Sequence, residues 1–131
     1  MFVTEELGLE KQTRFLTFRQ DPASFIQAAD CVVLSSEFEA FGLVLLEAIA
    51  CGTPAISSRC GGPQEILDNR DEFLYDVADI TALSQRIEFV KQNPDVARKL
   101  TMSLRDRALT IFDKDAVVDK YLSIYSGEYK W

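Results

Sequence analysis

The sequence has 131 residues with 21 acidic and 14 basic side chains, and its formal net charge is −7. With 47% hydrophobic and 27% charged residues, the composition is typical of a globular chain with one core rather than of a disordered chain. The acidic balance, without a block of Lys or Arg, argues against nucleic-acid binding. No apolar stretch approaches the ~20 residues that cross a bilayer, so we expect no transmembrane segment.

Histidine is absent from the chain. This excludes His-based catalytic triads and histidine zinc sites, and it removes the commonest general base. The three cysteines, Cys31, Cys51 and Cys60, form no C-x-x-C pair, and the first two lie in apolar runs where a reduced thiol behaves as a small hydrophobe. We therefore expect a cytoplasmic protein with reduced cysteines and no metal site.

Short apolar runs alternate with helical patterns through the first part of the chain. This alternation predicts an α/β fold with a partial Rossmann-like parallel sheet flanked by helices. In chain order, strands are expected at residues 14–18, 31–34, 54–57 and 73–75, with helices at residues 22–29, 42–51 and 64–67. From Asp79 onward apolar residues recur at helical spacing only, which predicts a tail of three helices, the first ending before Pro94.

The segment from residue 35 to residue 67 contains the candidate site. Gly42 begins a helix directly after the loop that follows a buried strand, and such a helix start presents N–H groups at the positive end of the helix dipole. At the carboxyl end of a parallel strand, this is where α/β sheets bind phosphate. The missing side chain of Gly42 lets a ligand approach the backbone. Taken alone the pattern is not specific, because every strand–loop–helix unit has such an end.

Two glutamates and a double glycine add detail to this site. Glu47 is the only charged residue of the helix at residues 42–51. Its carboxylate either accepts bonds from two neighbouring hydroxyls, such as those of a ribose, or lies on an exposed face. Glu39, in the loop before the helix, either faces the same cleft or is a solvated loop acid. The turn at Gly61 and Gly62 either carries backbone N–H groups to the cleft or is simply a turn.

The ordered motifs of this segment resemble the C-terminal, donor-binding domain of retaining glycosyltransferases with the GT-B fold, of the family 4 or group 1 type. The motifs are the Glu-x7-Glu spacing of Glu39 and Glu47, together with Phe41-Gly42-Leu43, Glu47-Ala48, Cys51-Gly52-Thr53-Pro54 and Gly61-Gly62-Pro63-Gln64-Glu65-Ile66. Two glutamates at this spacing would mean nothing alone, whereas the ordered set is specific. A weaker likeness covers nearly the whole chain.

The resemblance implies transfer of a sugar from a UDP-, GDP- or ADP-linked donor with retained anomeric configuration, and without a cofactor or an obligatory metal. It implies that Glu47 binds the ribose hydroxyls of the donor. It also implies that Glu39, the expected catalytic residue, contacts the hydroxyls of the donor sugar. It also implies that backbone N–H groups face the sugar and diphosphate at Phe41, Gly42 and Leu43. Neighbours of the base or the phosphates are expected at Phe18, Arg19, Arg59, Gly61 and Gly62.

The resemblance further implies that residues 1–131 correspond to part of a donor-binding domain. Family members grip the diphosphate with an Arg and a Lys in a segment that precedes the residues present here, and they have two further central strands and an N-terminal acceptor domain. Without those strands a sheet edge stays unpaired, so we expect a fragment, one chain of a split enzyme, or a homodimer that completes the sheet. Arg19 and Arg59 are the nearby basic residues that could partly replace the lost cations.

Three functions remain open from the sequence. The first is the donor-binding part of a glycosyltransferase that is active with its other half. The second is a catalytically inactive remnant that binds nucleotide-sugar, and the third is an interaction module with the same fold. The sequence does not determine the sugar, the base, the acceptor or a peripheral association with a membrane surface.

Overall fold

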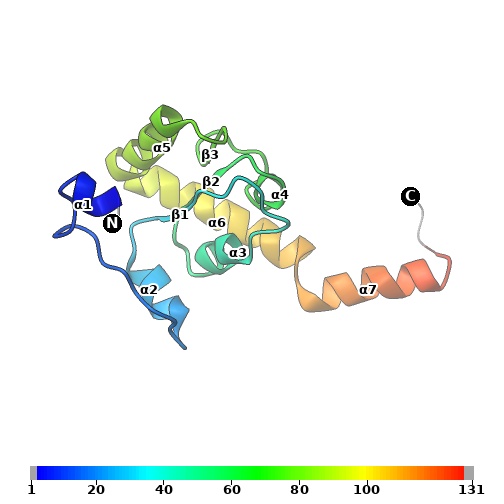
Figure 1. Cartoon of the computed structure of the whole chain (residues 1–131). Coiled ribbons are helices and arrows are strands. Elements are labelled where there is room, and N and C mark those ends of the chain that lie inside the picture. The colour runs from blue at the N-terminus through cyan, green and yellow to red at the C-terminus, as the bar shows by residue number, and fades with distance from the viewer. Residues whose placement is uncertain (1–2, 129–131) are drawn as a thin grey trace.

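A three-stranded parallel sheet lies at the centre of the computed structural model, which describes residues 3–128 (Figure 1). The strands β1 (Val32–Leu34), β2 (Ala55–Ser58) and β3 (Leu74–Tyr75) follow the order β1-β2-β3. Val32 pairs with Ala55, and Ser57 pairs with Leu74. All four residues of the middle strand β2 are buried, as expected for a parallel strand that is covered on both faces. The predicted α/β fold with a parallel sheet is confirmed.

Helices connect the strands and cover the sheet. Their bounds are α1 (Val3–Glu6), α2 (Pro22–Ala28), α3 (Leu43–Ala50), α4 (Gly62–Ile66), α5 (Ile80–Gln92), α6 (Pro94–Ile111) and α7 (Lys114–Tyr125). Helix α6 packs against α3 and α5, and α5 packs on β2 and β3. The three predicted C-terminal helices are confirmed, and Figure 1 shows that α7 projects away from the rest of the chain. No helix in the described part of the chain is long and apolar enough to cross a membrane.

The hydrophobic core forms where α3, β2 and the segment before β3 meet. Phe73 is the largest fully buried side chain. Helix α3 turns Leu45, Ala48 and Ile49 into the core and leaves Glu47 exposed. Its apolar residues follow the helical period, so one face is covered while the opposite face remains in solvent.

The strand predicted at residues 14–18 is wrong. This segment has no regular secondary structure, and the side chains of Phe15 and Phe18 are 67% and 89% exposed. Within residues 3–128, β1 pairs only with β2, so the other edge of β1 has no partner strand. A strand is stable only when a neighbour satisfies its backbone N–H and C=O groups, and the aromatic composition of this segment does not replace that neighbour.

Asp79 caps the start of α5, where its Oδ1 accepts a 2.8 Å hydrogen bond from the N–H of Ala82. We expect Asp79→Ala to lower the free energy of unfolding by about 1 kcal/mol, because an N-terminal helix N–H then loses its acceptor. Urea unfolding followed by far-UV circular dichroism measures this change. The matched control is Asp119→Ala on the exposed α7, which should change stability by less than about 0.5 kcal/mol. Equal effects of the two substitutions would contradict the capping role.

Candidate functional site

The candidate site lies at the carboxyl ends of β1 and β2, where the loop of residues 35–42 meets the turn of residues 59–63. Gly42 is the N-cap of α3, with φ +95° and no side-chain hydrogen bond to the helix start. Within residues 3–128, the N–H groups of Gly42, Leu43 and Val44 donate to no acceptor. The start of α3 is therefore an N–H-rich, electrically positive edge.

Glu39 is held in this loop by its own backbone. Its N–H donates to the C=O of Cys60 at 3.1 Å, and its C=O accepts from the N–H of Gly62 at 3.0 Å. Together these bonds form a parallel bridge between Glu39 and Gly61. The half-buried side chain lies with Oε1 3.5 Å from the N of Phe41, one residue before the N-cap of α3. The structure thus places the side chain of Glu39 beside Phe41 and the start of α3, and the predicted contacts of these residues with a donor stay a prediction.

Glu47 lies on α3 slightly more than one turn beyond the first residue, on the exposed face of the helix. Its carboxylate makes no hydrogen bond or ion pair with any described residue. The structure therefore shows the exposed-face alternative. Because the carboxylate of Glu47 is not buried, its charge needs no partner within the protein. An exposed carboxylate without a partner is available to a ligand, so its contact with a ribose stays a prediction.

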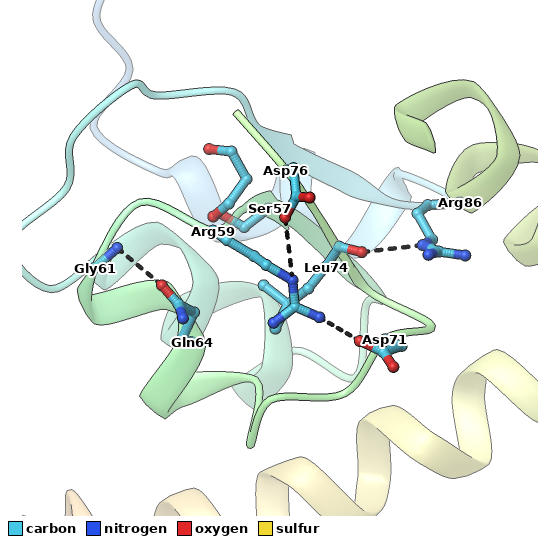
Figure 2. A network of polar contacts seen from close by, with 9 residues as sticks. Ser57, Arg59, Gly61, Gln64, Asp71, Leu74, Asp76 and Arg86 are labelled. Carbon is cyan, nitrogen blue, oxygen red and sulfur yellow. Dashed lines mark hydrogen bonds and ion pairs between the residues drawn. The ribbon is translucent and has the colours of Figure 1, made fainter. Parts of the chain in front are cut away.

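Arg59 follows β2 and is paired with two carboxylates. Figure 2 shows its guanidinium between Asp71 and Asp76, with an ion pair to Asp71 and 3.6 Å from Nε to Oδ1 of Asp76. The backbone N–H of Arg59 donates to the backbone C=O of Tyr75 at 2.8 Å. These contacts join the ends of β2 and β3. Because two negative charges already face this cation, it is a weaker candidate for a phosphate ligand than an unpaired arginine.

The backbone N–H groups of Gly61 and Gly62 both donate hydrogen bonds to other residues of the chain. The N–H of Gly61 donates to Oε1 of Gln64 at 3.3 Å (Figure 2), and the N–H of Gly62 donates to the C=O of Glu39. The observed role of this turn is to fasten the loop of residues 35–42. A direct contact of the two glycines with a ligand stays a prediction.

Phe18 and Arg19 lie in the irregular segment before α2. The Arg19 guanidinium stands 5.7 Å from the centroid of the Phe25 ring, a cation–π distance. Neither residue makes a hydrogen bond or ion pair with the site loops among the residues that the structure describes. The expectation that they neighbour the base or the phosphates stays untested.

Two contacts of the site loop were not predicted from the sequence. Ser58 is 1% exposed, and its Oγ donates to the C=O of Ser36 at 2.5 Å. The Phe41 ring packs edge-on against Phe112 at the end of α6, with centroids 5.4 Å apart and an angle of 80°. Ser58 follows the strand expected at residues 54–57, and no signal in the sequence identifies the partner of Ser58 or of Phe41.

Among residues 3–128, three titratable groups have shifted pKa values. Hydrogen bonds from Ser24, first of all from its hydroxyl, lower the pKa of Asp21, the N-cap of α2. Burial raises the pKa of Tyr75, against the effect of a hydrogen bond with Ser58. Burial also raises the pKa of Cys31, so this thiol is protonated at neutral pH and is a poor nucleophile. Among the described residues, no group of three His, Cys, Asp or Glu side chains is placed to hold a metal ion.

Known proteins are similar to most of this chain. The family profile described as "Glycosyl transferases group 1" matches residues 3–107. N-acetyl-alpha-D-glucosaminyl L-malate synthase of Bacillus anthracis is 32% identical over 124 residues, which cover 94% of this chain and 32% of that protein. D-inositol 3-phosphate glycosyltransferase of Saccharomonospora viridis is 36% identical over 128 residues, covering 95% of this chain and 30% of that protein.

Solved structures show the same fold. Anabaena HepE in complex with UDP matches with a TM-score of 0.87 and 26% identity, over 95% of this chain and 35% of that chain. Sucrose-phosphate synthase from Thermosynechococcus elongatus matches with a TM-score of 0.84 and 30% identity, over 95% of this chain and 32% of that chain.

The fold and the family match define a C-terminal domain of the GT-B glycosyltransferase type. This chain belongs to the family of group 1 glycosyl transferases. It spans about a third of the length of the curated relatives that it matches.

Proposed function

We propose that this chain supplies the donor-binding part of a glycosyltransferase that transfers a sugar from a nucleotide-sugar with retention of configuration. The observation that carries the proposal is the start of α3, where N–H groups without an acceptor among the described residues lie between Glu39 and Glu47. Family membership and the likeness to HepE, whose structures hold UDP and UDP-glucose, support it.

The diphosphate of the donor would bind at the start of α3. Backbone N–H groups of Gly42 and Leu43 would provide hydrogen-bond donors, and the helix dipole favours negative charge there. The N–H of Phe41 donates to Oε1 of Glu39 at 3.5 Å, so it would contact the donor only after exchanging this acceptor. Arg59 is already paired with Asp71 and Asp76. The backbone N–H groups and the helix dipole would therefore be the main contribution of this chain to diphosphate binding.

The two glutamates would bind the sugar-like parts of the donor, one the ribose and the other the transferred sugar. Glu47 projects from the exposed face of α3 and would accept hydrogen bonds from the ribose hydroxyls. Glu39 precedes the helix and would face the hydroxyls of the donor sugar as the catalytic residue. Transfer requires stabilisation of an oxocarbenium-like centre and of a departing diphosphate, and preorganised dipoles and charges supply it without a metal or cofactor of the protein.

The unpaired edge of β1 would be covered by strands from outside residues 3–128. A strand edge with unpaired backbone groups is a template for another strand, and this chain spans about a third of its relatives. The further strands would come from additional polypeptide of the same enzyme or from a second chain. A homodimer that joins two β1 edges is the alternative, and size-exclusion chromatography with light scattering would distinguish it.

Calorimetric titration of the 131-residue chain with UDP-, GDP- and ADP-glucose tests the proposal. We expect saturable binding of at least one nucleotide-sugar and no binding of free glucose. A folded chain that binds none of the three would contradict the donor-binding role and favour an interaction module. Binding without sugar transfer, after addition of the N-terminal part of a relative, would favour the inactive nucleotide-sugar-binding alternative.

A further inference from the structure

We propose that Gly62 and Ser58 are positioning residues, which hold the loop carrying Glu39 in place before a donor binds. The inference rests on the proposed function, in which Glu39 faces the donor sugar. It concerns how the protein sets the position of that residue relative to α3.

The loop of residues 35–42 is fastened to the end of β2 at two points. Near its start, the C=O of Ser36 accepts the 2.5 Å hydrogen bond from the buried Ser58 hydroxyl. At Glu39, the N–H bonds to Cys60 at 3.1 Å and the C=O bonds to Gly62 at 3.0 Å. Both peptide groups that flank the Cα of Glu39 are thus engaged with the same turn. A loop held on both sides in this way is preorganised and does not need a ligand to order it.

The backbone around Gly62 leaves almost no space between the turn of residues 59–63 and the loop of residues 35–42. A Cβ on Gly62 would lie 2.4 Å from the Cα of Phe41, 2.5 Å from the O of Ala40 and 2.6 Å from the O of Phe41. All three atoms belong to the backbone, so none can rotate away as a flexible side chain would. A single methyl group at this position must therefore separate the turn from residues 39–41.

The displacement would affect Glu39 more than Glu47. Glu47 is fixed by α3, which is anchored in the core through Leu45, Ala48 and Ile49. Glu39 has no such anchor and depends on the turn. Moving the loop would change the distance between the residue that faces the sugar and the residue that faces the ribose.

The first test measures amide hydrogen exchange by NMR in the chain without ligand. We expect the N–H groups of Glu39 and Gly62 to be protected in the unmodified chain and to lose protection in Gly62→Ala. Gly8→Ala is the control for an added methyl group without a contact: its φ of +66° strains a side chain locally, but nothing lies within 4 Å of a Cβ built there. Exchange of both amides at unstructured rates in the unmodified chain would overturn the inference, whether or not a donor binds.

The second test compares UDP-glucose with UDP by calorimetry. In Gly62→Ala we expect affinity for UDP-glucose to fall about tenfold, the equivalent of one lost hydrogen bond to a charged group, and affinity for UDP to fall less than about threefold. Equal losses for both ligands, or no loss, would overturn the positioning role. If Gly62→Ala does not fold, Ser58→Ala provides the same comparison, because it removes the bond to Ser36 without adding an atom. Its control is Tyr75→Phe, which removes only the hydrogen bond between Ser58 and Tyr75.

The two tests separate this inference from the proposed function. Protected amides in a chain that binds neither UDP-glucose nor UDP would contradict the donor site and leave the positioning of the loop supported. Binding of UDP-glucose by a chain with unprotected amides would support the donor site and overturn the positioning role.

Discussion

Glu47→Gln is expected to lower the affinity of the chain for UDP-glucose by about tenfold to a hundredfold. Hydrogen bonds to a charged acceptor contribute about 1.5–3 kcal/mol each, and a factor of ten corresponds to about 1.4 kcal/mol. The amide keeps one oxygen acceptor but loses the negative charge and the second acceptor. Since Glu47 is exposed and has no partner among the described residues, its substitution should leave the free energy of unfolding within about 0.5 kcal/mol of the unmodified chain.

Titration calorimetry and urea unfolding of the same preparations measure both effects. Glu37→Gln is the matched control, because it removes an exposed charge from the loop before α3 at a residue to which we assign no ligand contact. Unchanged UDP-glucose affinity in Glu47→Gln would remove the ribose role. Equal weakening in both variants would show a general electrostatic effect instead of a specific contact.

Phe73→Ala is expected to lower the free energy of unfolding by about 3–5 kcal/mol. Phe73 is 0% exposed and is the largest fully buried side chain, so truncation removes buried apolar surface and leaves a cavity. The C=O of Phe73 also accepts from the N–H of Ser57 at 2.9 Å, so the cavity adjoins the pairing of β2 and β3. For a domain whose total stability is about 5–15 kcal/mol, this loss is large.

Guanidinium unfolding at equilibrium measures the change through the midpoint concentration. The control is Phe38→Ala, because Phe38 is 81% exposed and its truncation should change stability by less than about 0.5 kcal/mol. Similar midpoints for Phe73→Ala and the unmodified chain would contradict the packing of this core.

Much of the fold could be predicted because local patterns and tertiary contacts agree. The apolar run before residue 35 forms β1, and the helix expected at Gly42 begins at Leu43 with Gly42 as its N-cap. The helix expected at residues 64–67 begins earlier, at Gly62, because Pro63 is suited to the first turn. The helical pattern predicted from Asp79 onward begins as α5, with Asp79 as its N-cap, and the break predicted at Pro94 separates α5 from α6.

The candidate site could be located from the sequence but not described in detail. A glycine at a helix start after a buried strand predicts a phosphate-binding edge, since both features are local. The pairing of Arg59 with Asp71 and Asp76, and the contact of Ser58 with Ser36, join residues from different loops. Side-chain partners of this kind depend on which loops fold next to each other, and composition and periodicity carry no information on that.

By itself the sequence determined the order of β1 to β3 and of α2 to α7, the position of Gly42 at the start of α3, and the family likeness carried by the ordered motifs. Those features depend on residue type and on spacing along the chain. Tertiary structure alone decided that residues 14–18 form no strand, that Glu47 is exposed, and that the N–H of Gly62 bonds to Glu39. Each of these outcomes depends on a neighbour distant in sequence, because backbone groups and charges reach their final state only when the surrounding elements supply or withhold a partner.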